Sequence, residues 1–176
     1  MIPKARGFMS DILTRSEPVP TTPFVTAGVT ITLAPPMARY SLRARQPQAL
    51  ETVLKIKIPQ KIGETQGGVA CLGPDEWLMR ASSGVTIPMG DGRQIAVTDV
   101  SERSITLIVE GPRAAETLLS GCPLDLDRFA VGCATRTIYE TVEIILIREA
   151  DERFHVEVWR SFAPWLWTAL TTAASY

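Results

Sequence analysis

The sequence predicts an α+β fold of two ferredoxin-like units, each a strand, a helix and a hairpin, with helices packed on antiparallel or mixed sheets. The segment 97–127 carries the clearest signals. Apolar residues alternate with polar ones over 105–109, which predicts a half-buried strand. Gly111 and Pro112 then end the strand and begin a helix, because proline suits a first helical position that needs no backbone N–H. The order of strand, helix and hairpin occurs twice along the chain, which favours an internal two-fold repeat.

The helix after Pro112 has a defined face and a defined end. Ala115, Leu118 and Leu119 fall on one side at helical spacing, so this side should face a sheet. Gly121 stands where a helix commonly ends in a left-handed residue, and we expect it to be that C-cap.

The N-terminal half predicts the first unit. Alternation over 29–33 predicts a short strand, which a Pro-Pro pair ends and which we expect at a sheet edge. A second strand over 39–45 precedes a helix that Pro47 begins and that ends before Pro59. Apolar runs on either side of the turn 73–76, rich in Gly, Pro and Asp, then predict a hairpin.

The strand 39–45 has one apolar and one basic face. Arg39, Arg43 and Arg45 alternate with apolar residues. Arginine forks can recognise carboxylates or phosphates, but a row of charges on one strand is more often its solvated face. We therefore expect these arginines to face solvent.

The C-terminal half predicts three strands and a final helix. Strands are expected over 134–139, 142–147 and 154–159, and the nearly unbroken apolar run 142–147 suggests a central strand covered on both faces. In the last strand, Phe154 and its alternate residues point one way and His155 and its alternate residues the other.

The final helix is expected to begin at Ser161 as its N-cap. A stripe of apolar residues at helical spacing should face the core: Phe162, Trp165, Leu166, Ala169, Leu170 and Ala173. Trp167 lies outside this stripe and near Trp159 on the preceding strand. Large exposed aromatic residues are enriched at interface hot spots, so Trp159 and Trp167 are the interface candidates; the alternative for Trp167 is cover by a loop.

Length and composition fit one globular domain over 29–176 behind an N-terminal arm of residues 1–28. The chain has 176 residues, of which 45% are hydrophobic. The arm is rich in proline and polar residues, so it is either a disordered terminus or an extended segment that lies along a partner. The net charge of -1 gives no general attraction to nucleic acid or to an anionic membrane.

Metal and nucleophile sites find little support. The three cysteines, Cys71, Cys122 and Cys133, have no zinc spacing, and an odd number fits reduced thiols in a cytoplasmic protein. No secretory signal or membrane span is visible. His155 is the single histidine, no GxSxG elbow accompanies it, and we expect a surface histidine. We predict no catalytic, cofactor-binding or metal residue in this chain.

Several motifs resemble one known family, over roughly 70–170 with a weaker fit back to about Ala38. The matching segments are Leu72 to Met79 (LGPDEWLM), Asp99-Val100-Ser101, Gly111-Pro112, Gly121 to Asp127 (GCPLDLD), Phe129, Gly132, Ala134 to Thr137, and Glu157 to Trp167 (EVWRSFAPWLW). With these segments the chain resembles the gamma subunit family of heterotetrameric sarcosine oxidase. That family has a fold akin to the folate-binding fold of the glycine-cleavage aminomethyltransferase.

The resemblance implies a structural subunit with alpha, beta and delta partners. The whole complex would oxidatively demethylate sarcosine to glycine, producing hydrogen peroxide and 5,10-methylenetetrahydrofolate. Its FAD, FMN, NAD, tetrahydrofolate and zinc would belong to the other subunits. Self-association of the isolated chain stays open, as does the identity of the N-methyl amino acid.

The acidic pair that folate-binding enzymes use would fall near Glu143 and Ile144, so the second carboxylate becomes an isoleucine. An isoleucine cannot move a proton. If the alignment slips by a residue or two, Glu140 or Glu143 would survive. The other acidic candidates, Asp99, Asp125 and Asp127, are expected to be turn and cap residues. Two alternatives remain: a free-standing folate-binding protein of the aminomethyltransferase type, and the small subunit of an N-methyl amino acid dehydrogenase.

Overall fold

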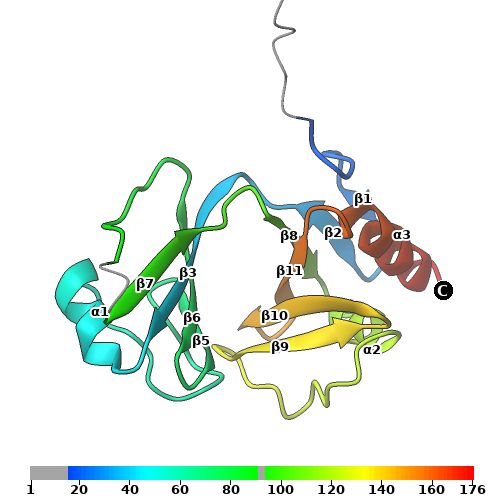
Figure 1. The fold of residues 1–176 in the computed structure, drawn as a ribbon. Coiled ribbons are helices and arrows are strands. Elements are labelled where there is room, and N and C mark those ends of the chain that lie inside the picture. Colours follow the sequence, from blue (N-terminus) through cyan, green and yellow to red (C-terminus); the bar gives the residue numbers. More distant parts are fainter. Residues whose placement is uncertain (1–15, 91–93) are drawn as a thin grey trace, which may run out of the picture.

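The computed structural model describes residues 16–90 and 94–176, which form two antiparallel sheets and three helices (Figure 1). The first sheet, sheet A, contains in spatial order β1 (Phe24–Val25), β2 (Thr30–Leu33), β8 (Ser104–Glu110), β11 (Arg153–Trp159), β10 (Val142–Ala150) and β9 (Ala134–Tyr139). The second sheet, sheet B, contains β4 (Thr65–Gln66), β5 (Val69–Gly73), β6 (Glu76–Ser82), β3 (Met37–Ala44) and β7 (Ile95–Asp99). The helices are α1 (Pro47–Leu54), α2 (Ala114–Leu119) and α3 (Ala163–Ala174).

The two predicted strand-helix-hairpin units are present. In the first, β3 and α1 lead to the β5–β6 hairpin, and β6 returns beside β3. In the second, β8 and α2 lead to the β10–β11 hairpin, and β11 returns beside β8. The strand before each unit pairs with the first strand of the other one: β2 lies on β8, and β7 lies on β3. This exchange ties the two units together, and the prediction of two ferredoxin-like units is confirmed.

The elements stack in four layers. Figure 1 shows α1 on the outside of sheet B, and α2 and α3 on the outside of sheet A. One apolar core packs α2 and α3 on sheet A through Leu118, Leu166 and Leu170. A second packs α1 on sheet B through Leu50. The remaining faces of the two sheets meet each other, with a small apolar contact of Ala70, Ala134 and Ile147 between them.

This contact between the sheets changes the environment of β8. We predicted a half-buried strand, yet its polar positions are buried as well, with Ser104 9% and Thr106 1% exposed. The alternation was correct, but sheet B covers the face that we expected to meet solvent. In the same way β2 is not at an edge, because β1 lies beyond it.

Only some of the predicted helix boundaries are present: α2 begins at Ala114 with Arg113 as its N-cap, and not at Pro112, and the predicted caps are not found. Pro47 begins α1 as expected, and Lys55 ends it in the left-handed conformation. Gly121 is not a left-handed C-cap, since the residue after α2 is Ser120 with right-handed φ and ψ. The space beside Gly121 explains the glycine instead: a Cβ there would lie 2.6 Å from the ring of Tyr139.

The buried face of α3 is rotated from the predicted stripe. Ser161 is not the N-cap, because Phe162 occupies that position and makes no side-chain cap. Phe162 and Trp165 are exposed rather than in the core. The fully buried positions are Ala163, Leu166, Leu170 and Ala174.

Residues 1–15 of the predicted N-terminal arm lie outside the described residues. The remainder of the arm, from Ser16 to Gly28, packs on the chain's own domain. Val19 is 5% exposed and joins the core of sheet A, and β1 pairs with β2. The guanidinium of Arg160 donates a hydrogen bond to the Ser16 carbonyl and lies 3.5 Å from the Glu17 carboxylate. In the described part of the chain no helix is long and apolar enough to cross a membrane.

Candidate functional site between the two sheets

Six polar side chains form a network between the sheets, which we call the inter-sheet network. Sheet B contributes Arg39 and Arg80, and sheet A contributes Thr106, Glu149, His155 and Glu157. Arg39 and Arg80 are direct neighbours across β3 and β6, and Thr106 and Glu157 are direct neighbours across β8 and β11. Each pair therefore points from one sheet toward the other.

One half of the network is a closed triangle around Arg39. Its Nε donates to Glu157 Oε2 at 2.7 Å, and its Nη2 donates to Thr106 Oγ1 at 2.6 Å. The Thr106 hydroxyl in turn donates to Glu157 Oε1 at 2.5 Å. All three residues are at most 3% exposed. The prediction that Arg39 faces solvent is wrong because sheet A covers this end of β3; Arg43 and Arg45 are exposed as expected.

The other half of the network surrounds Arg80 and His155. Arg80 Nη1 donates to His155 Nδ1 at 2.7 Å, and Arg80 Nη2 lies 3.4 Å from Glu149 Oε1. His155 Nε2 lies 3.0 Å from Glu149 Oε2, a close contact without hydrogen-bond geometry. His155 is only 8% exposed, so our prediction of a surface histidine is wrong. The cause is again the cover that sheet B provides.

The contact with Arg80 fixes the tautomer of His155. An arginine only donates, so Nδ1 accepts and the proton of the neutral imidazole is on Nε2, toward Glu149. Burial lowers the pKa of His155 and Arg80 lowers it further, while Glu149 opposes this shift. A second proton would have to enter at Nδ1 against the guanidinium, so the neutral ring is the form that this site stabilises.

A hollow of about 600 Å³ adjoins this half of the network. Its walls include Pro36, Met37 and Ser82, and Arg80, Glu149 and His155 reach its base. The ionisable groups at the base are engaged with one another. His155 has no free lone pair with which to accept a proton from a ligand, so the arrangement suits the joining of two sheets better than acid–base chemistry.

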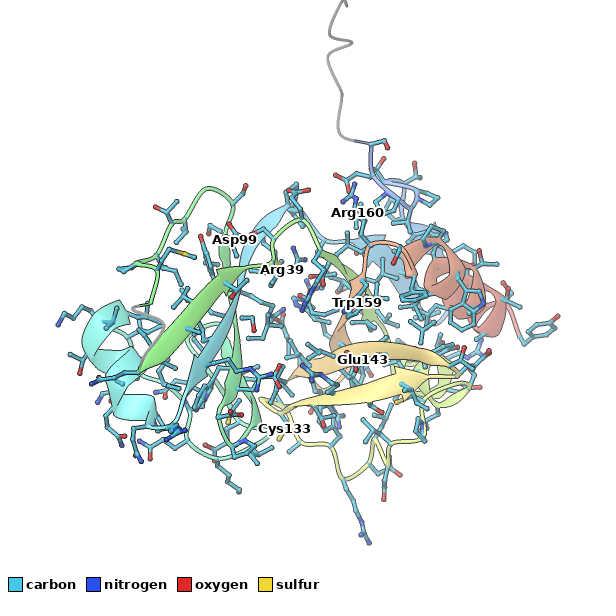
Figure 2. The ribbon with its side chains drawn as sticks, in the orientation of Figure 1. Arg39, Asp99, Cys133, Glu143, Trp159 and Arg160 are labelled. Carbon is cyan, nitrogen blue, oxygen red and sulfur yellow. The ribbon has the colours of Figure 1, made fainter. Side chains whose placement is uncertain are left out.

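At the position of the folate-binding acidic pair, this chain has an exposed carboxylate, Glu143, and a buried aliphatic side chain, Ile144. Glu143 is exposed and lies 3.7 Å from Arg136 Nε. Ile144 is 1% exposed and belongs to the core under α2 and α3. The two side chains point to opposite faces of β10, so they cannot act on one ligand. Glu143, labelled on β10 in Figure 2, lines a small hollow together with Arg39 of sheet B.

The other acidic candidates are exposed: Asp99 ends β7, and Asp125 and Asp127 lie in the segment between α2 and β9. Asp99 accepts hydrogen bonds from the Ser101 backbone N–H at 2.8 Å and from its hydroxyl at 2.6 Å, and these bonds lower the pKa of Asp99. Asp125 accepts a hydrogen bond from the Arg128 backbone at 3.4 Å. Asp127 lies in the same exposed loop. The structure does not bring these three to one site.

The two interface candidates have different environments. Trp159 is 44% exposed at the end of β11, and its ring lies 6.3 Å from that of Phe162. Trp167 is partly buried and packs against the core of sheet A, so it is less exposed than expected, and its role at an interface stays a prediction. A helical turn of about 100° per residue explains the difference, because the buried face of α3 is centred on Leu166 and Leu170 and reaches Trp167.

The cysteines do not gather. All three are free, and within residues 16–90 and 94–176 no group of three His, Cys, Asp or Glu side chains could hold a metal ion. The residues that sequence reasoning missed are Arg80, Thr106, Glu149 and Glu157 as members of one network. A charged residue inside an otherwise apolar strand, such as Glu157, was the available signal, since such residues are rarely buried without a partner.

The sequence of this chain is similar to a known protein family. Residues 38–176 match the family described as "Sarcosine oxidase, gamma subunit family". The chain is 31% identical to sarcosine oxidase subunit gamma of Arthrobacter sp. over 144 residues, which cover 72% of this chain and 70% of that protein. It is 29% identical to the subunit of the same name from Corynebacterium sp. (strain P-1), with the same shares covered.

Two solved structures resemble the fold. Heterotetrameric sarcosine oxidase from Corynebacterium sp. U-96, in complex with pyrrole 2-carboxylate, contains a chain that matches with a TM-score of 0.74 at 26% identity, covering 84% of both chains. Glycine cleavage system aminomethyltransferase T from Bartonella henselae matches with a TM-score of 0.62 at 14% identity, covering 82% of this chain and 45% of that one, which shows a shared fold. The family match covers most of the chain, and this chain therefore belongs to the sarcosine oxidase gamma subunit family.

Proposed function

We propose that this chain is the gamma subunit of a heterotetrameric sarcosine oxidase and that its role there is structural. The observation that carries this proposal is the match of 84% of the chain, at a TM-score of 0.74, to a chain of such an oxidase. The assembly would oxidatively demethylate sarcosine to glycine, with hydrogen peroxide and 5,10-methylenetetrahydrofolate as products. Its alpha, beta and delta subunits would be the partners, and its cytoplasmic location agrees with three free cysteines.

The residues of the inter-sheet network support a role without chemistry. Arg39, Thr106 and Glu157 use their hydrogen-bonding groups on one another, and His155 is engaged by Arg80. The site of the acidic pair does not fit a folate, since Ile144 is in the core. We infer that the FAD, FMN, NAD, tetrahydrofolate and zinc of the complex are held by the other subunits.

Two measurements test this proposal. Co-expression of the four subunits should give a complex from which a tagged gamma chain recovers the other three in equal amounts; recovery of the gamma chain alone would overturn the subunit role. Calorimetry of the isolated chain with tetrahydrofolate should show no saturable heat. Micromolar binding that is lost in Glu143→Ala would instead favour a folate-binding protein of the aminomethyltransferase type.

A further inference from the structure

Three aromatic side chains and one arginine form an exposed group where β11 meets α3. We call it the aromatic patch: Trp159, Phe162, Trp165 and Arg103. The aromatic residues are 44%, 46% and 39% exposed. The rings of Trp159 and Phe162 lie 6.3 Å apart, and Phe162 is the N-cap of α3. Trp165 lies in the first turn of the helix, with its ring 6.4 Å from that of Tyr139.

The arginine of the patch is held over the tryptophan. Arg103 Cζ lies 5.4 Å from the centre of the Trp159 ring, a cation–π distance. The loop that carries Arg103 is fixed on both sides of this residue: its N–H donates to Val100 O at 3.0 Å, and its carbonyl accepts from Arg160 N at 2.8 Å. The pair is therefore positioned before any partner arrives.

Arg103 differs from the arginines around it in its charge balance. Arg160 lies 3.5 Å from Glu17, and Arg136 lies 2.6 Å from Glu76. The Arg103 guanidinium lies over the ring of Trp159 and forms no ion pair with any residue of 16–90 or 94–176. Glu143 lines the same small hollow of about 30 Å³ beside Trp159, but Arg136 already engages it at 3.7 Å. The patch thus presents one uncompensated cation among exposed rings.

This chemistry specifies the kind of partner. Tryptophan and arginine are enriched among the residues that dominate binding energy. A guanidinium on an aromatic ring keeps its N–H groups free for a carboxylate, and exclusion of water strengthens both interactions. The complementary surface is an apolar side chain next to an aspartate or glutamate.

Resting on the proposed function, we propose that the aromatic patch docks on another subunit of the oxidase, at a segment that presents a carboxylate beside an apolar side chain. Figure 2 labels Trp159 at the end of β11, next to Arg160, where the chain continues into α3. A second copy of this chain is the alternative occupant.

The test uses the co-expressed four-subunit complex with a tagged gamma chain. Trp159→Ala should weaken assembly at least about thirtyfold, which corresponds to a hot-spot loss of about 2 kcal/mol. Arg103→Glu should weaken it about tenfold or more, and Arg103→Lys should restore part of the loss. The matched controls are Arg128→Glu, at a side chain that is 89% exposed, and Ile62→Ser, at a residue that is 58% exposed; both should assemble normally.

The outcomes separate this proposal from the proposed function. If the unsubstituted chain recovers no other subunit, the proposed function fails. If it recovers all three and Trp159→Ala and Arg103→Glu do so as well, the docking surface is wrong while the subunit role stands. Thermal unfolding of each variant shows whether the chain still folds. If Trp159→Ala does not fold, Arg103→Glu still tests the proposal, because Arg103 is exposed. Sedimentation of the isolated chain as a dimer that either variant converts to a monomer would assign the patch to self-association and overturn the proposal.

Discussion

Arg39 Nε and Glu157 Oε2 lie 2.7 Å apart, on different sheets and 118 positions apart in the chain. Both side chains are almost completely buried, with 4% and 2% of their surface exposed. The pair joins the first strand of one unit to the last strand of the other, and Thr106 fixes it by accepting from Arg39 and donating to Glu157. Figure 2 shows Arg39 at the boundary between the two halves of the molecule.

Glu157→Gln should lower the free energy of unfolding by about 3–5 kcal/mol, because it leaves the Arg39 guanidinium buried without a counter-charge. Urea unfolding followed by circular dichroism measures the change. Asp75→Asn is the control: it removes half of the exposed Arg43–Asp75 pair at 3.1 Å and should cost less than about 1 kcal/mol. A double variant, Arg39→Met with Glu157→Leu, should recover most of the loss. Equal, small effects of Glu157→Gln and Asp75→Asn would contradict the role of the buried pair.

The strand that carries Glu157, β11, was predicted correctly from the sequence, but the burial of its polar face was not. Alternation over 154–159 reports that Phe154 and His155 point to opposite faces. It does not report whether a second sheet covers the polar face, because that depends on contacts between residues 67 to 118 positions apart. His155, Arg39 and Thr106 were misjudged for this one reason, whereas the hairpin at 73–76 and the helix at Pro47 depend on local geometry and were predicted correctly.

His155 should make the stability of the chain depend on pH below about 7. Burial lowers the pKa of folded His155 below the value of about 6.5 in the unfolded chain. The unfolded chain therefore binds more protons in this range, so stability is complete above pH 6.5 and falls as the pH decreases toward the folded pKa, by at most about 1.4 kcal/mol per pH unit. The charged groups that face the ring are Arg80, Glu149, Arg153 and Glu157.

Urea unfolding at several pH values between 5 and 7.5 measures this dependence. His155→Gln should flatten it, since glutamine can accept from Arg80 but does not titrate. The control is Glu116→Gln, which removes an exposed carboxylate paired with Arg113 and should leave the slope between pH 5 and 7.5 unchanged. The same slope in the His155→Gln variant and the unsubstituted chain would show that other groups cause it.

Trp167 and Trp165 on α3 should differ in their contributions to stability. Trp167 packs against the core of sheet A, so Trp167→Ala should lower the free energy of unfolding by about 2–4 kcal/mol. Trp165 is 39% exposed, and the centre of its ring lies 6.4 Å from that of Tyr139 in a T-shaped arrangement, so Trp165→Ala should cost about 1 kcal/mol. Thermal unfolding of both variants compares them. A larger loss for Trp165→Ala than for Trp167→Ala would instead support the buried face of α3 that was predicted from the sequence.

Which side of α3 is buried could not be predicted from the spacing of its apolar residues. The predicted stripe through Phe162 and Trp165 and the observed one through Ala163 and Leu166 both recur with the helical period. The final helix is apolar on most of its surface, so periodicity alone does not select the buried side. The packing of α3 on α2 and sheet A selects it, and the small residues Ala163 and Ala174 are buried in this core.

The three thiols should react at different rates. Cys71 and Cys122 are 1% and 3% exposed, whereas Cys133 is partly exposed at the point where Glu64 and Cys133 bridge the two sheets. Burial raises the pKa of Cys71, so little of its reactive thiolate forms near neutral pH. A disulfide reagent at pH 8 should therefore modify one thiol rapidly and the other two only as the chain opens. Cys133→Ser should remove the rapid phase, while Cys122→Ser should leave it unchanged. Three equally rapid thiols would show that the core under β5 and α2 opens readily, contrary to the packing described above.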